Sequence, residues 1–217
     1  MKIKDFIWIF SLVSITLFIF LPTTNTIFVK LTTNHPYMMG FLKTMILASM
    51  GEILVKRFKT GFYFSDKGFY LKALIWGILG LMFVFVFPLF DGGIRYIFRN
   101  RTFFNNLFMN SFLYALIISA SMNLIFAPTF MLLHRITDAY IDLSEGSIKR
   151  ISNISIDQII EKINFKFFIS FVLLKTIPLF WIPAHTLTFM LPHTYRVLMA
   201  SYLSIALGIL LSIKSKK

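Results

Sequence analysis

The segment HPYMMGFLKTMILASMGEILVKRF, from His35 to Phe58, decides the fold class of this chain. It is apolar and exceeds the roughly 20 residues that a helix needs to cross a bilayer. It nevertheless contains Lys43 and Glu52. An ionisable group inside a membrane is costly unless it pairs, lines water or reaches the interface. The segment therefore predicts a membrane helix with at least one charged residue facing other helices.

Composition extends this prediction to the whole chain of 217 residues. Hydrophobic residues make up 57% and charged residues 14%, and the mean hydropathy is +0.77. The apolar stretches are long and do not alternate with polar residues, which favours helices over a β-barrel. We expect an all-α protein, a polytopic membrane helix bundle that forms a single membrane domain over residues 1–217.

About six transmembrane helices are predicted from the apolar stretches. They cover residues 6–21, 36–55, 71–90, 112–133, 167–187 and 197–213. The first of them could be a cleaved signal peptide, but it lacks a small-residue cleavage site and Asp5 interrupts its basic start. We interpret it as an extra N-terminal span that is retained.

Basic residues predict the orientation of the bundle. When the chain is threaded through these spans, most of its 22 Lys and Arg residues fall on the side of the N-terminus. Cytoplasmic loops are enriched in Lys and Arg, so both termini are predicted to be cytoplasmic. The same rule accounts for the net charge of +13, and we expect no nucleic-acid partner.

The longest connection, residues 134–166, is predicted to be a cytoplasmic loop with an amphipathic helix. The sequence SIDQ from Ser155 to Gln158 is a capping box that starts a helix. Its apolar side would carry Ile156, Ile159, Ile160 and Ile163. We expect this helix to lie on the membrane surface, or alternatively to bind a partner protein.

Small and polar residues recur every four positions in three of the spans. The rows are Gly40, Thr44, Ala48 and Glu52; Ser111, Ala115, Ser119, Asn123 and Ala127; and Arg196, Ala200, Ser204, Gly208 and Ser212. Such rows allow membrane helices to approach closely. They indicate the inward faces of the bundle, and they either serve packing alone or line a polar path.

Ionisable residues within the spans are the main candidates for function. Glu52 lies on its row and should face the bundle, whereas Lys43 lies off the row and should reach outward along its stem. Lys175 has the same ambiguity as Lys43. Asp91 and Arg95 are four residues apart and form a candidate pair at a helix end.

Prolines predict irregular helices. Pro88 suggests a bent end to the third span, and Pro178 with Pro183 suggests a kinked fifth span. A tight turn and a new helix should follow near Pro192. Carbonyl groups freed by a kink can bind ions or accept a neighbouring hydroxyl, of which the second is the commoner.

The sequence favours a protein that is not an enzyme. His134, Asp138 and Asp142 have the spacing of a metal-binding face, but we expect them at the membrane edge, in contact with water and headgroups. No zinc-protease motif, P-loop or nucleophile–base pair is present. We therefore predict no catalytic residue, no metal and no cofactor.

Short motifs over residues 35–214 resemble the Mpv-seventeen and peroxisomal-membrane-protein-of-22-kDa family. In chain order they are His35-Pro36, Gly51-Glu52, Pro88 with Gly92, Phe126 to Pro128, Trp181, Phe189, Pro192, Tyr195-Arg196 and Leu211 to Lys214. Several polar residues of the family pattern are replaced, by Lys56, Met122-Asn123, His185 and Thr188. Residues 6–21 have no counterpart in the family core.

The resemblance implies a location and a function. Relatives occupy mitochondrial inner and peroxisomal membranes, related proteins occur in bacteria, and some are reported to act as channels for small solutes. We expect a multi-pass protein of the bacterial cytoplasmic membrane, or alternatively of an organellar membrane. It would be a channel or transporter for small solutes, with the lipid bilayer as its surroundings and a homo-oligomer as a possible state.

Candidate residues for the polar interior are Glu52, Asn123, His185 and Arg196, followed by Lys43 and Lys175. The alternative function is a membrane scaffold or partner subunit that does not transport. A substrate-binding subunit of a vitamin transporter belongs to this second class.

Overall fold

The computed structural model describes residues 3–64, 67–99 and 111–214, and all regular structure in these ranges is helical. The helices are α1 (Ile3–Phe20), α2 (Pro22–Asn34), α3 (Pro36–Thr60), α4 (Phe69–Arg99), α6 (Ser111–Ile125), α7 (Ala127–Leu143), α8 (Ile148–Ile151), α9 (Ile156–Lys162), α10 (Phe165–Phe167), the π-helix η2 (Phe168–Trp181), α11 (Ile182–Met190) and α12 (His193–Lys214).

Membrane-spanning helices are identified here by length and composition. In the described ranges four qualify, namely α1, α3, α4 and the continuous helical segment Phe165–Met190. A fifth is added if α6 and α7, which meet at an angle of 46°, form one broken span. The all-helical class is thus confirmed, and several of the helices are long and apolar enough to cross a membrane. The sixth predicted span is also helical, as part of α12. However, α12 is not among the helices that meet the criteria of length and composition for crossing a membrane.

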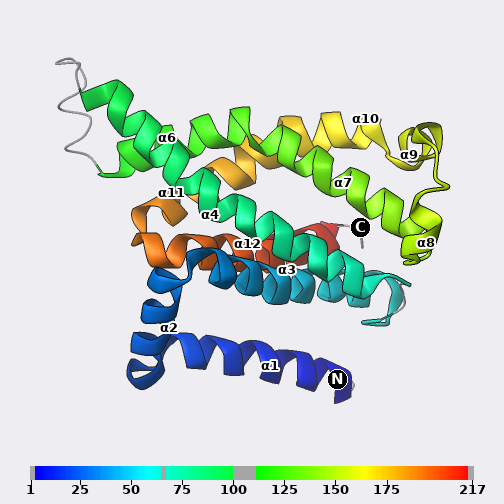
Figure 1. Cartoon of the computed structure of the whole chain (residues 1–217), viewed down its shortest axis with the longest axis horizontal. Helices are drawn as coiled ribbons and strands as arrows, with labels where there is room; N and C mark the ends of the chain where they lie inside the picture. Colours follow the sequence, from blue (N-terminus) through cyan, green and yellow to red (C-terminus); the bar gives the residue numbers. More distant parts are fainter. Residues whose placement is uncertain (1–2, 65–66, 100–110, 215–217) are drawn as a thin grey trace.

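The long helices lie side by side and run back and forth along one direction (Figure 1). Helix α3 is central, with its most extensive contacts to α4 and α12. Both chain ends lie toward the same end of the bundle as α8, α9 and the connection from α3 to α4 (Figure 1). We call this the terminal end.

Small residues bring α3, α4 and α12 together, and those on α3 include members of a predicted row. Gly40, Thr44 and Ala48 are all buried, and a Cβ atom on Gly80 would lie 2.7 Å from the hydroxyl of Thr44. That hydroxyl is 3.2 Å from the hydroxyl of Ser201 in α12. The rows therefore pack the centre of the bundle.

Helix α2 was not predicted. It runs crosswise to α1 and α3 at the end of the bundle opposite the terminal end (Figure 1). The Asn25 side chain donates to the carbonyl of Ile19 and to the hydroxyl of Tyr195, each at 2.8 Å. Phe28 is 2% exposed. These contacts anchor α2 as a cover over the ends of α3 and α12.

Helix α1 is attached by polar contacts along its length. The carboxylate of Asp5 accepts two hydrogen bonds from Arg57, at 2.8 and 3.1 Å. It also accepts one from Tyr63, whose pKa is raised by burial and by that hydrogen bond. The Trp8 indole donates to the carbonyl of Met50 at 3.1 Å. Asp5 therefore has a structural partner on α3.

The connection predicted over residues 134–166 is shorter than expected, because α7 remains helical to Leu143. The predicted capping box of Ser155 and Gln158 is present and starts α9. Only part of the predicted apolar side is covered: Ile159 and Ile163 pack against α7, whereas Ile156 and Ile160 are exposed.

The helix from residue 165 to residue 190 is irregular, as its prolines predicted. It winds as a π-helix through Pro178 and returns to an α-helix at Ile182. The hydroxyl of Ser119 in α6 donates to the carbonyl of Ile182 at 2.7 Å. This hydrogen bond joins α6 to the first residue of α11. Pro88, by contrast, does not end α4, which continues to Arg99.

Candidate functional site

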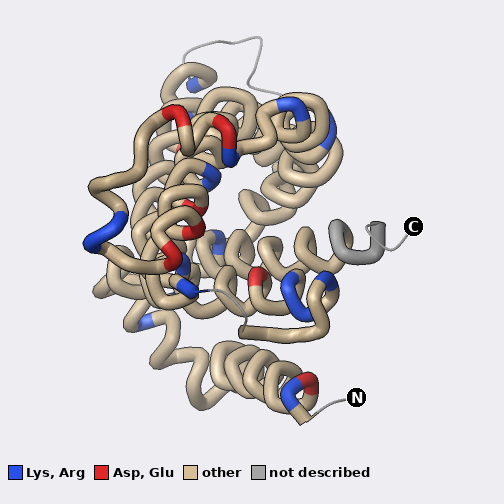
Figure 2. The backbone as a smooth tube through the Cα atoms, turned by 90° about the vertical axis from the view of Figure 1, so that its right-hand side faces the viewer, with Lys and Arg blue, Asp and Glu red and all other residues tan. Residues whose placement is uncertain are grey.

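A cavity of about 250 Å³ lies among α3, α4, α7, η2 and α12. We call it the Glu52 cavity. Its walls are mostly apolar, and its polar lining includes Glu52, His134, Arg135, Asp138 and Thr176. Viewed from the terminal end, acidic and basic residues are spread over several helices and connections (Figure 2). The cavity therefore combines an apolar enclosure with a small set of ionisable groups, which is typical of a ligand site.

The ionisable groups of the Glu52 cavity come from two helices. In α7, His134 and Asp138 lie on one face, with Nδ1 of the histidine 3.6 Å from Oδ2 of the aspartate. From α3, Oε1 of Glu52 lies 3.6 Å from Nε2 of the same histidine. The ring of Trp76 in α4 packs on the imidazole, with centroids 4.3 Å apart. Asp142, the third residue of the predicted face, instead pairs with Lys72 at 2.7 Å.

A second cavity, of about 360 Å³, lies among α2, α3, α4 and α12 near the end opposite the terminal end. We call it the Lys43 cavity. Its polar lining includes Thr32, Lys43, His193 and Arg196. Basic side chains therefore line this cavity, whereas carboxylates and histidine predominate among the ionisable groups of the Glu52 cavity.

The expectation that Lys43 reaches the surface is wrong. The residue is only 7% exposed, its ammonium lies 4.7 Å from the centre of the Phe28 ring, and it is 3.5 Å from the carbonyl of Thr194. The physical reason is α2, which covers the path that the side chain would otherwise take to water. A cation–π contact and a carbonyl stabilise the buried charge instead.

Phe83 lines both the Glu52 cavity and the Lys43 cavity. Its ring packs against Phe130 and Phe87, with centroids 4.7 and 5.5 Å apart. Phe87 continues the cluster toward Phe189. An aromatic cluster therefore separates two cavities that lie toward opposite ends of the bundle.

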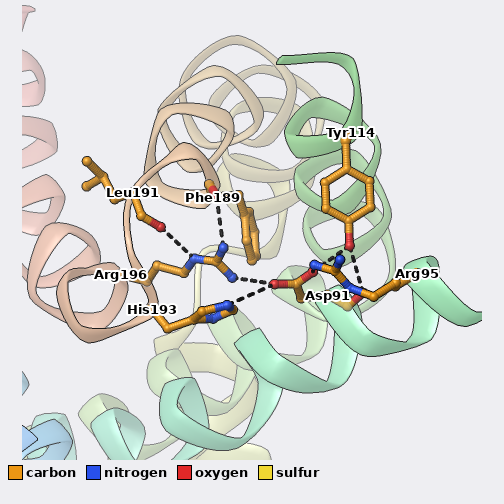
Figure 3. Close-up of polar contacts among 7 residues, drawn as sticks. All are labelled: Asp91, Arg95, Tyr114, Phe189, Leu191, His193 and Arg196. Carbon is orange, nitrogen blue, oxygen red and sulfur yellow. Dashed lines mark hydrogen bonds and ion pairs between the residues drawn. The ribbon is translucent and has the colours of Figure 1, made fainter. Parts of the chain in front are cut away.

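Asp91 is the centre of a polar network beside the Lys43 cavity (Figure 3). Its carboxylate accepts a 2.6 Å hydrogen bond from Arg196 and a 2.5 Å hydrogen bond from the hydroxyl of Tyr114. Arg95 lies 3.3 Å away and His193 lies 3.8 Å away. Three parts of the chain, in α4, α6 and α12, therefore converge on one carboxylate.

Arg196 also binds two backbone carbonyls. It donates to Phe189 at 3.0 Å and to Leu191 at 3.1 Å, at the end of α11 and in the turn that follows (Figure 3). The predicted pair of Asp91 and Arg95 is present, but Arg95 is largely exposed. The partner that sequence reasoning missed is Arg196, which is 105 positions from Asp91. No spacing rule connects residues so far apart.

Asn123 and His185 meet in the core between α6 and α11. The histidine Nδ1 lies 3.1 Å from Oδ1 of the asparagine, whose amide donates to the carbonyl of Ser119 at 2.8 Å. Trp181 stacks on the imidazole, with centroids 5.1 Å apart. These two predicted candidates are brought together, but they lie outside the lining of the Glu52 and Lys43 cavities.

Lys175 is exposed on the outer surface of η2, whereas its neighbours Thr176 and Ile177 are buried. It lines neither the Glu52 cavity nor the Lys43 cavity, so of the two alternatives left open for Lys175 the position at the surface agrees with the structure and the position in the polar interior does not. Thr176 and Ile177, which follow Lys175, lie on the buried face of η2.

No protein-family model, curated protein or solved structure matches this chain. The motifs of the resemblance nevertheless have clear positions in the fold. Pro36 begins α3, and the Phe126 to Pro128 motif lies at the bend between α6 and α7. Arg196 lies in the network of Asp91.

Proposed function

We propose that this chain is a channel or transporter for small solutes, with the Glu52 cavity and the Lys43 cavity as two halves of one path. The observation that carries the proposal is that Phe83 lines both cavities. In this proposal Phe83 and its aromatic neighbours form the barrier. Apolar constrictions close membrane pores because water does not remain in them.

The two cavities limit the size of the solute. Their volumes are about 250 and 360 Å³, whereas a water molecule occupies about 30 Å³ in the liquid. A small metabolite fits either cavity, but a large ligand does not. The solute would meet two carboxylates, a histidine and Arg135 on one side of Phe83, and Lys43, His193 and Arg196 on the other.

The proposal includes a membrane arrangement. Six spans with both termini in the cytoplasm would make the Glu52 cavity the cytoplasmic half of the path, since Lys and Arg concentrate on that side. The resemblance to the Mpv-seventeen family supports a channel, and a bacterial cytoplasmic membrane is the proposed location.

Replacing Phe83 with alanine should increase solute flux, because it removes the ring shared by the two cavities. A barrier lowered by about 1.4 kcal/mol raises the rate about tenfold. The measurement is uptake of graded anions, cations and neutral sugars into liposomes that contain the purified protein. The assay buffer contains EDTA, so that bound metal plays no part.

The matched control is Phe85→Ala. Phe85 lies two residues away on α4 and is 58% exposed, so its ring is outside the barrier and its loss should leave flux unchanged. Equal flux in both variants and the wild type, from protein shown to be folded and inserted, would contradict the path through Phe83.

A second candidate function is a scaffold or partner subunit that does not transport. The observation that favours it is the close packing of small residues among α3, α4 and α12. Helix packing alone explains these residues, without a path for a solute. Absence of flux for every solute, in the wild type and in Phe83→Ala, would favour this function.

A further inference from the structure

We propose that Glu52, His134 and Asp138 form a binding site for a divalent transition-metal cation, with Zn²⁺ as the best-fitting ion. The site lies in the wall of the Glu52 cavity. This inference does not rest on the passage of a solute, because it concerns binding to the folded protein alone.

The geometry of the three side chains suits a metal. One ligand atom from each of the three residues can be chosen so that all three lie within 4.8 Å of one another. Nε2 of His134 lies 3.6 Å from Glu52, and the other ring nitrogen, Nδ1, lies 3.6 Å from Asp138, so binding through either nitrogen requires one carboxylate to rotate toward it. Ligands on a tetrahedral zinc ion, each about 2.0–2.1 Å from the metal, are about 3.3–3.4 Å apart. Small side-chain rotations would complete the coordination.

Two of the ligand groups carry buried atoms without a partner. Within residues 3–64, 67–99 and 111–214, neither Nε2 of His134 nor Oδ1 of Asp138 has a hydrogen bond. A buried polar atom without a hydrogen bond destabilises the folded state. A bound cation would satisfy both atoms, since imidazole nitrogen and carboxylate oxygen are both zinc ligands.

The surroundings position these ligands. His134 and Asp138 are four residues apart on α7 and thus project from one face of the helix. Trp76 packs on the imidazole ring and restricts its rotation. The nearby ammonium of Lys72 is paired with Asp142 at 2.7 Å, whereas the guanidinium of Arg135 lines the same cavity as the triad.

Three protein ligands leave a fourth coordination position. In zinc proteins an open position of this kind holds water or a substrate. Here it would face the Glu52 cavity, which all three ligand residues line. The cation would therefore be accessible from the cavity.

The test uses the full chain, purified in detergent and stripped of metal with EDTA. Binding of Co²⁺ is followed by its visible absorption, and Zn²⁺ is then added as a competitor. We expect one equivalent of Co²⁺ to bind, Zn²⁺ to displace it, and Zn²⁺ to raise the melting temperature, because a ligand that binds only the folded state stabilises it.

The variants are Glu52→Gln, His134→Gln and Asp138→Asn, each of which keeps the side-chain size close to the original. Loss of an outer-shell partner already weakens metal binding about 10–100-fold, so loss of a ligand should weaken it at least as much. The matched controls are Glu161→Gln and His35→Gln, at exposed positions outside the triad, and they should bind as the wild type does.

Two results would overturn the metal site. One is wild-type protein that is folded by circular dichroism and size exclusion but binds neither ion. The other is unchanged affinity in all three triad variants. In either case the triad is only a polar contact between α3 and α7. Flux measured in EDTA is independent of this outcome, so metal binding and solute passage can fail separately.

Discussion

Replacing Asp91 with asparagine will lower the free energy of unfolding by about 3–5 kcal/mol, the cost of breaking a buried ion pair by removing one partner. The Asp91 side chain is 4% exposed and that of Arg196 is 9% exposed. Asparagine keeps the volume of the side chain but removes its charge, which leaves the guanidinium buried without a counterion. The effect is large because three parts of the chain depend on this carboxylate.

The measurement is denaturant unfolding of the protein in detergent micelles, followed by tryptophan fluorescence. The control is Arg95→Ala, since Arg95 is also bound to Asp91 but its side chain is 61% exposed. Exposed ion pairs contribute only about 0–1 kcal/mol, so this variant should be nearly as stable as the wild type. Equal losses in Asp91→Asn and Arg95→Ala would show that Arg196 is not the principal partner.

Replacing Gly80 with alanine should destabilise the bundle by about 1–3 kcal/mol, the usual cost of overpacking. A Cβ atom at this position would collide with the carbonyl oxygen of Gly40 and lie 2.7–2.8 Å from two atoms of Thr44. The carbonyl belongs to the α3 backbone, so the collision is relieved only if α3 and α4 move apart. That movement would also weaken the contact of Thr44 with Ser201.

Gly93→Ala is the matched control on the same helix. No atom lies within 4 Å of a Cβ atom built there, and alanine is favoured over glycine in a helix by about 1 kcal/mol. The control should therefore be neutral or slightly stabilising in the same micelle assay. A loss of stability in Gly93→Ala as large as that in Gly80→Ala would mean that close approach of α3 and α4 is not the cause.

Much of the fold can be predicted from local sequence patterns. Long apolar stretches predict the membrane helices, a spacing of four predicts which faces of α3, α6 and α12 are buried, and Ser155 with Gln158 predicts the start of α9. All of these depend on residues within a few turns of one helix. The helix α2 escaped prediction because its stretch is short and only moderately apolar.

The candidate site was only partly predictable. The sequence identified Glu52 as the inward-facing acid of its span, and it identified His134 and Asp138 as one helix face, but it did not join them. Lys43 was expected to reach outward, but α2 covers it; Lys175 was left ambiguous between surface and interior, and it is exposed on η2.

By itself, the sequence determined that this chain is a helical membrane protein and which residues share a helix face. Only the tertiary structure decided that Asp91 meets Arg196, that Glu52 meets His134, and that Phe83 separates two cavities. The physical reason is that helical periodicity fixes the direction of a side chain relative to its own axis. Which helix lies in that direction depends on how all the helices pack together.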